Sequence, residues 1–322
     1  MRDLISRRKF IVLSAAAGGA GLVPLGSSRA AAAAAPPVEW TGVVLGALST
    51  MRLHHPDREA GKRIIQRAVA EAHRLEGIFS LYRTDTALSE LNRRGVLVAP
   101  PAELVELLDL CDRLWHDTDG TFDPSVQPLW RCYADHFSAT GADPRGPAPE
   151  RLAAALELVG WRNVKASRDR IVFARRGMGL TLNGIAQGYI TDRVVRLLRE
   201  EGIESSLVDM GEISALGPRP DGQPWRAAIE GAAQGEPQRS LDLVDKAVAT
   251  SAADGFRFTP DARCNHLFNP ATGGCAAPSR ALTVVANDAA TADALSTAGT
   301  LMDEKALAAL AVRRADVSIL SA

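Results

Sequence analysis

The order of two hydrophobic periodicities along the chain is the feature that most constrains its fold. Apolar residues recur at three- and four-residue spacing in 57–79 and 101–115, which predicts two amphipathic helices. From residue 170 onward, short apolar runs separated by Gly, Pro and Asp predict strands instead. The expected strands are 170–174, 179–182, 205–209, 225–230, 239–243, 247–250, 281–286 and 317–320. Helices first and hairpin-like strands afterwards are typical of an α+β domain with mixed or antiparallel sheets flanked by helices, and they disfavour a doubly wound parallel sheet.

Helical spacing also predicts helices at 150–159, 188–200, 291–302 and 304–313. Gly202 stands where the helix over 188–200 would end in a left-handed residue. The 322 residues are 46% hydrophobic and 23% charged, which is ordinary for a globular protein. Because no repeat and no long low-complexity linker divides the chain, we expect one compact domain over 34–322.

Residues 1–33 have the pattern of an export signal. Arg7 and Arg8 precede an apolar stretch at 12–25, and small residues at 30–35 offer cleavage frames. The stretch is shorter than the roughly 18–20 apolar residues that span a bilayer, so no stable membrane anchor is expected. The pattern resembles a cleavable twin-arginine signal peptide and predicts a periplasmic protein. A disordered basic N-terminus is the alternative.

Charge and cysteine usage argue against several classes of function. Lys and Arg total 37 against 38 Asp and Glu, for a net charge of −1, and aromatic residues make up 5%. A nucleic-acid partner is therefore not expected, since phosphate neutralisation needs basic residues and base stacking needs aromatic ones. The cysteines form no C-x-x-C pair, which argues against a zinc or thioredoxin-like site. Cys264 and Cys275 could form a disulfide or, like Cys111 and Cys132, remain thiols.

The densest chemical signal is the segment TLNGIAQGYITD at 181–192. Gly184 and Gly188 let the backbone approach another group closely at a point where a strand ends and a helix begins. Backbone N–H groups at a helix N-terminus suit a phosphate. The spacing matches neither a Walker A loop nor G-x-G-x-x-G, and a purely structural turn is the alternative.

Asp293 and Thr297 form a second signal, because residues four apart on a helix face the same side. A carboxylate and a hydroxyl are hard oxygen ligands that suit Mg²⁺, which keeps waters and shares substrate phosphates. The alternative is that Asp293 only interacts with the helix dipole and Thr297 lies at the surface.

Three weaker signals are His266 before an Asn-Pro turn, the turn at 119–124, and Tyr82. His266 stands at an expected strand end, where a side chain can meet a ligand. The turn could present Asp123 or backbone groups to a ligand. Tyr82 could stack on a planar ring, with burial in the core as the alternative.

Together these signals resemble the FAD:protein FMN transferase (ApbE) family. The matching blocks are LYRTDTALSELN, DGTFDPSVQPL, LTLNGIAQGYITDRV, VATSAAD, HLFNPATGG and ADALSTAG, spread from Gly42 to Met302. The resemblance implies an ApbE-like domain that binds FAD and Mg²⁺. It also implies transfer of FMN through a phosphoester to a Thr or Ser of a target protein, with release of AMP.

The resemblance also implies roles for individual residues. Gly184 corresponds to the position whose carbonyl binds Mg²⁺, and Asp293 and Thr297 correspond to the side-chain ligands. Positions that correspond to contacts with the flavin nucleotide are Leu45, Tyr82, Thr121, Phe122, Asp123, Thr181, Gln187 and Leu267. His266 matches the family histidine and is our first candidate for accepting the hydroxyl proton, with Asp293 second.

Several positions depart from the family pattern. Thr181 and Gln187 replace an Asp and a Lys, and Asn269 replaces another Asp. Asp209-Met-Gly-Glu-Ile replaces Asn-x-Gly-Gly-Asp. These features and the twin-arginine pattern resemble the NosX branch, which implies a membrane-anchored, NosR-like acceptor in nitrous oxide respiration. The alternatives are a periplasmic FAD-binding or flavin-delivery protein without transferase activity, and a Mg²⁺-dependent FAD pyrophosphatase.

Overall fold

A seven-stranded sheet organises the computed structural model, which describes residues 36–229 and 239–321. The sheet order is β1-β2-β6-β7-β10-β11-β12, and every pair of neighbours is antiparallel. The strands are β1 (Val38–Val44), β2 (Ala47–Leu53), β6 (Ser206–Asp209), β7 (Ile213–Leu216), β10 (Ala247–Ala252), β11 (Ala281–Ala286) and β12 (Ser318–Ser321). The register pairs Thr50 with Asp209 and Val248 with Ile213. One end of the sheet therefore gathers the start of β2, the β6–β7 turn and the end of β10.

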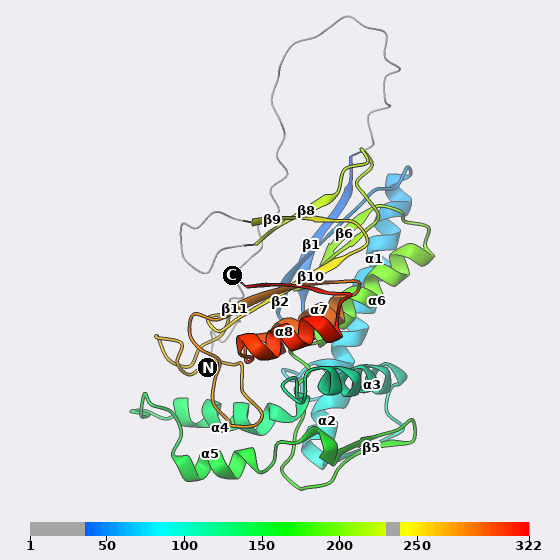
Figure 1. Cartoon of the computed structure of the whole chain (residues 1–322). Helices are drawn as coiled ribbons and strands as arrows, with labels where there is room; N and C mark the ends of the chain where they lie inside the picture. Colours follow the sequence, from blue (N-terminus) through cyan, green and yellow to red (C-terminus); the bar gives the residue numbers. More distant parts are fainter. Residues whose placement is uncertain (1–35, 230–238, 322) are drawn as a thin grey trace, which may run out of the picture.

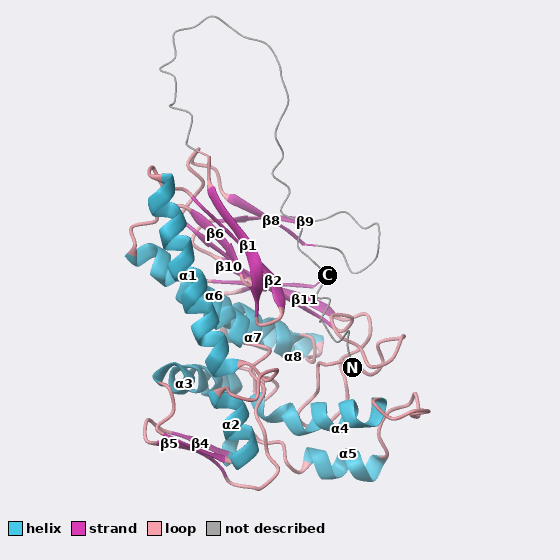
Figure 2. Cartoon of the chain, turned by 180° about the vertical axis from the view of Figure 1, so that it is seen from behind, coloured by secondary structure: helices cyan, strands magenta, loops and turns pink. Residues whose placement is uncertain are grey.

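Three helices cover one face of this sheet, as Figure 2 shows. They are α1 (Arg58–Phe79), α6 (Ala186–Glu200) and α7 (Ala289–Gly299), and α8 (Glu304–Arg313) follows α7. Their apolar sides form the main core, where Phe79, Leu75 and Leu295 are almost fully buried. Asp57 caps α1 because its carboxylate accepts from the backbone N–H groups of Glu59 and Ala60.

A short hairpin covers the other face. Strands β8 (Trp225–Ile229) and β9 (Arg239–Leu243) form a separate two-stranded sheet. Trp225 packs there with a small apolar cluster that includes Ile213 and Val248 of the large sheet. The middle of the large sheet is thus buried between helices and this hairpin (Figure 1).

The remaining elements form a lower tier in Figure 1. Its helices are α2 (Ala87–Arg94), α3 (Ala102–Asp117), α4 (Gln127–Phe137) and α5 (Pro149–Leu156), with short 3-10 turns η1 (Pro124–Val126) and η2 (Trp161–Asn163). A small antiparallel sheet joins β3 (Val96–Val98), β5 (Arg170–Phe173) and β4 (Val164–Ala166).

An aromatic cluster, defined here as Trp130, Tyr133, Phe137, Phe258 and Phe268, ties α4 to the loop between β10 and β11. The Phe137 and Phe258 rings stack with centroids 5.6 Å apart. All four cysteines are free thiols, and Cys132, Cys264 and Cys275 belong to the apolar region around these rings.

The α+β prediction is confirmed, and the helices over 57–79, 188–200 and 304–313 lie within two residues of their predicted bounds. The expected order of helices before strands was wrong, because β1 and β2 precede α1 and join the large sheet. The prediction also missed α2 and α4. Among the described residues, no helix is long and apolar enough to cross a membrane. The predicted signal segment, 1–33, lies outside the described residues.

The predicted strand at 179–182 was also wrong. This segment is neither strand nor helix, and its hydrogen bonds go to other elements. The Asn92 side chain on α2 accepts from the Leu180 N–H and donates to the Leu180 carbonyl. The Thr181 N–H donates to the Pro124 carbonyl at 2.8 Å. These bonds attach the segment to α2 and η1 of the lower tier.

Candidate active site

Gly184 and Thr297 meet at the sheet end described above. A Cβ atom on Gly184 would stand 3.0 Å from Thr297 Oγ1, so the glycine backbone packs directly against this hydroxyl. Ser251, near the end of β10, approaches the same hydroxyl. Its Oγ is 3.2 Å from Thr297 Oγ1 and 2.8 Å from Ser296 Oγ. Two segments more than a hundred residues apart in the sequence are thereby brought together.

Asp293 lies one turn before Thr297 on α7 and is 1% exposed. Its Oδ2 accepts a hydrogen bond from the Gly188 N–H at 3.3 Å, in the first turn of α6. A Cβ on Gly188 would stand 2.3 Å from the Ala289 carbonyl oxygen, so only glycine allows α6 to approach α7 this closely. The positive end of the α6 dipole also favours a carboxylate here.

The oxygens of Asp293, Thr297 and Gly184 fit a hard cation. They comprise one carboxylate, one hydroxyl and one backbone carbonyl, which suits Mg²⁺ because this ion keeps several waters and shares substrate phosphates. Within 36–229 and 239–321 there is no group of three His, Cys, Asp or Glu side chains that could hold a metal. A motif search for metal-binding side chains would therefore miss a site of this composition.

Tyr82 stands above the same loop and is 69% exposed, so its burial in the core is excluded. Its hydroxyl lies 3.5 Å from Asn183 Nδ2, and the Asn183 N–H donates to Thr181 Oγ1 at 3.3 Å. The exposed ring is thus available for stacking next to the start of α6. Asn183 thus links Tyr82 to Thr181.

The turn with Thr121, Phe122 and Asp123 adjoins Thr181 through the Pro124 carbonyl. Phe122 is part of the main core. The Asp123 carboxylate is bound within its own turn, since Oδ1 accepts from the Ser125 N–H and hydroxyl. Its Oδ2 accepts from the Trp161 N–H at 3.1 Å, and burial raises the pKa of this carboxyl. The side chain of Asp123 therefore shapes the turn.

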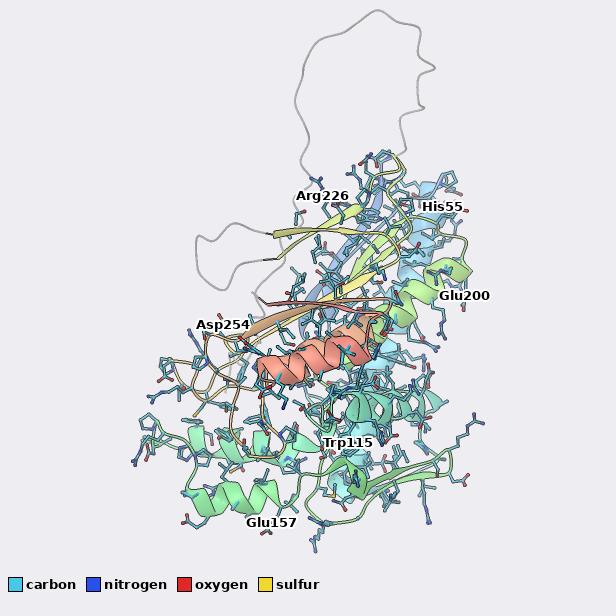
Figure 3. The ribbon with its side chains drawn as sticks, viewed as in Figure 1. His55, Trp115, Glu157, Glu200, Arg226 and Asp254 are labelled. Carbon is cyan, nitrogen blue, oxygen red and sulfur yellow. The ribbon has the colours of Figure 1, made fainter. Side chains whose placement is uncertain are left out.

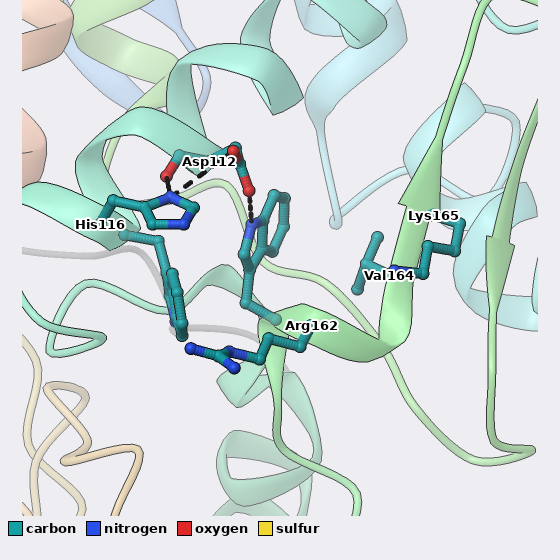
Figure 4. A pocket seen from close by; sticks show the side chains of 7 residues that line it. Asp112, His116, Arg162, Val164 and Lys165 are labelled. Atoms are coloured by element: carbon teal, nitrogen blue, oxygen red, sulfur yellow. Dashed lines mark hydrogen bonds and ion pairs between the residues drawn. The ribbon is translucent and has the colours of Figure 1, made fainter.

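A separate cavity of about 250 Å³ is lined by Asp112, His116 and Arg162, among others (Figure 4). The indole Nε1 of Trp161 donates to Asp112 Oδ1 at 2.9 Å. The Arg162 guanidinium lies 5.1 Å from the centre of the Trp115 ring. Because the Trp161 N–H also donates to Asp123, the wall of this cavity supports the turn. None of the predicted site residues lines the cavity.

His266 and Leu267 lie in the loop between β10 and β11. His266 Nδ1 is 2.9 Å from the Phe256 carbonyl oxygen. A carbonyl only accepts, so Nδ1 carries the hydrogen and Nε2 is the basic nitrogen of the neutral ring. Leu267 is buried with Ala253 and Ala276. Figure 3 labels Asp254 in the same loop and Trp115 lower in the molecule, near the end of α3.

The replacement at Asn269 preserves the local structure. Its Oδ1 accepts from the N–H groups of Ala271 and Thr272, as a carboxylate would at this position. The loop that carries His266 therefore keeps its turn without the family aspartate.

Gln187 and Leu45 lie at the same end of the sheet. A Cβ on Gly211 would stand 2.5 Å from Gln187 Nε2, so this side chain lies against the β6–β7 turn. Asp209 Oδ1 accepts from the Gly211 N–H, and burial raises the pKa of Asp209. Leu45 occupies the β1–β2 turn with φ 48° and packs against the main core.

Sequence reasoning missed Ser251, Asn183 and Asp192. Ser251 contacts Thr297, Asn183 contacts Tyr82, and Asp192 binds the start of α7. Their partners lie far away in the sequence, so spacing gives no signal for these contacts. The only signal for Ser251 was its place in the block VATSAAD.

The chain is similar to known proteins over most of its length. The family model described as the ApbE family matches residues 45–320. An FAD:protein FMN transferase of Chlamydia pneumoniae is 25% identical over 72% of this chain and 74% of its own. The apo crystal structure of the Pseudomonas stutzeri flavinyl transferase ApbE is 29% identical with a TM-score of 0.73, over 88% of this chain and 94% of its own. The ApbE protein of Thermotoga maritima is 26% identical with a TM-score of 0.77, over the same shares. The chain belongs to the ApbE family.

Proposed function

We propose that this protein is a Mg²⁺-dependent FAD:protein FMN transferase. In the reaction, the oxygen of an acceptor Thr or Ser forms a bond to the FMN phosphorus of FAD. The bond from that phosphorus to the bridging oxygen breaks, AMP leaves with the bridging oxygen, and the hydroxyl proton goes to a base. The name of the curated relatives supports the reaction class.

The observation that carries the proposal is the convergence of Gly184, Asp293 and Thr297. They come from two distant segments: Gly184 packs against Thr297, and Asp293, one turn earlier on α7, accepts from the Gly188 N–H in the first turn of α6. When bound there, Mg²⁺ would offset the charge of the FAD diphosphate and polarise the phosphorus under attack. The N-terminus of α6 contributes a positive partial charge to the same place.

His266 is our candidate for the base. The Phe256 carbonyl accepts from Nδ1, which orients the ring and makes Nε2 its basic nitrogen. Asp293 is less suited, because it is buried and already accepts from Gly188. Tyr82 would stack on the flavin or adenine ring and orient the nucleotide.

The cellular setting is part of the proposal. The paired arginines at 7 and 8 favour export to the periplasm, and the NosX-like departures at Thr181 and Gln187 favour a NosR-like acceptor. A periplasmic acceptor fragment with an exposed Thr is therefore the substrate to use in an assay.

The test is an analysis of products after incubating the full chain with FAD, Mg²⁺ and such a fragment. We expect AMP and flavin fluorescence on the denatured acceptor in equal amounts. AMP with free FMN and no labelled protein would identify a pyrophosphatase and refute the transferase. Bound, unconverted FAD without AMP would refute catalysis and favour a flavin carrier.

A further inference from the structure

Helices α6 and α7 are joined at two points along one face of α6. Gly188 and Asp192 are four residues apart and so lie on the same side of this helix. Gly188 contacts Asp293 through its N–H, and Asp192 reaches the beginning of α7. We call this contact, formed by Gly188, Asp192, Ala289, Ala290 and Asp293, the helix seam.

Asp192 binds the N-terminus of α7 with both carboxylate oxygens. Oδ1 accepts from the Ala289 N–H at 2.7 Å and Oδ2 from the Ala290 N–H at 2.9 Å. The Thr291 N–H is taken by the N-cap residue Asp288 at 2.7 Å. The first three N–H groups of α7 are thus satisfied, two of them by a side chain from another helix.

The buried surface of α7 consists largely of small side chains, namely Ala289, Ala290, Ala292, Ala294 and Ala298, together with Leu295. These side chains pack closely on α6 and on the sheet. The two hydrogen bonds that Asp192 accepts at one end of α7 have defined directions, and they add to this packing in fixing the rotation of the helix. Contacts of Ser251 hold the other end, at Ser296 and Thr297.

We propose that Asp192 is a positioning residue for the metal ligands on α7. By holding the first turn of α7 against α6, it sets the rotation at which Asp293 and Thr297 face Gly184. The inference rests on the proposed function in one respect, that these three residues bind Mg²⁺. Asp192 itself contacts the backbone of α7 and acts through that helix.

The test compares Asp192→Asn with Asp303→Asn in the full chain saturated with FAD. Asn at 192 keeps the size of the side chain but loses the charge and one acceptor. Asp303 caps α8 by accepting from the Ala306 N–H, so Asp303→Asn makes the same change of charge at a helix N-terminus away from the seam. Mn²⁺ serves as the probe, and the free ion is measured by electron paramagnetic resonance.

We expect Asp192→Asn to bind Mn²⁺ about 10–100-fold more weakly, the usual effect of removing a group that orients metal ligands. Raising Mg²⁺ should restore its kcat, which a collapsed fold would not allow, and Asp303→Asn should bind as the unaltered chain does. Asp192→Glu, which keeps both acceptors on a longer arm, should lie between.

Unchanged Mn²⁺ affinity in Asp192→Asn would overturn the inference while leaving the transferase intact. A folded variant whose kcat does not recover at high Mg²⁺ would overturn it as well. Failure of the unaltered chain to bind Mn²⁺ would refute the metal assignment itself, and the inference with it.

Discussion

The helix seam and the aromatic cluster hold the candidate active site in different ways. The seam joins two helices through backbone N–H groups, two carboxylates and closely packed Gly and Ala residues. The aromatic cluster supports the loop of His266 through large rings and one hydroxyl contact, from Tyr133 to the Gly273 carbonyl. We infer that the seam determines the orientation of the reacting groups and that the cluster determines the stability of the loop.

The largest effect is expected at the seam, from Asp293→Ala. Loss of the only carboxylate among the three proposed ligands should abolish Mg²⁺-dependent AMP release. The fold should survive, because loss of the acceptor for the Gly188 N–H costs about 1–3 kcal/mol. Asp303→Ala is the control, and full AMP release by Asp293→Ala would remove this residue from the metal site.

His266→Ala should have the next largest effect on turnover. Loss of a positioned base lowers kcat by about 10²–10⁴-fold, while FAD affinity should change little. Steady-state kinetics at saturating FAD measures this, with the exposed His73→Ala on α1 as control. An unchanged kcat would rule out proton transfer by His266.

Phe268→Ala tests the aromatic cluster. Truncating a buried Phe costs about 3–5 kcal/mol of stability, because the ring packs 5.0 Å from Tyr133 between centroids. Urea unfolding measures the loss, with the exposed Val312→Ala as control. Mn²⁺ affinity of the remaining folded protein should be unchanged, and a large loss of affinity would contradict the division between the two regions.

The smallest effect concerns pH. Burial raises the pKa of Asp192 to about 7, from an ordinary value of 3.8. The folded state therefore binds more protons than the unfolded state between these values, and stability should fall as the pH rises from about 4 to about 7. Asp192→Asn cannot ionise, so its Tm should fall less over this range. An equally steep fall in Tm would show that other groups cause it.

The sequence predicted correctly those elements whose stabilising residues lie within the element itself. The helix at 58–79 shows a long apolar stripe and an Asp cap, and both are visible in the sequence. The segment at 179–182 looked like a strand because its residues favour extended backbone. Its partners, Asn92 and Pro124, belong to other elements, and the sequence does not indicate this pairing.

The candidate site likewise has a part that the sequence predicts and a part that depends on packing between distant elements. Asp293 and Thr297 could be paired by helical spacing, but their approach to Gly184 depends on how α6 packs on α7. The resemblance to a family supplied that link. The role of Asp192 was not predicted, because its carboxylate binds backbone N–H groups nearly a hundred residues away in the sequence.

Intact-mass measurement of the acceptor fragment is the most direct test of the central claim. The fragment is incubated with FAD and the full chain, with and without Mg²⁺, in parallel with Asp293→Ala. Our account predicts a covalent FMN adduct only with the unaltered chain and Mg²⁺. An adduct formed equally well by Asp293→Ala, or without Mg²⁺, would contradict it.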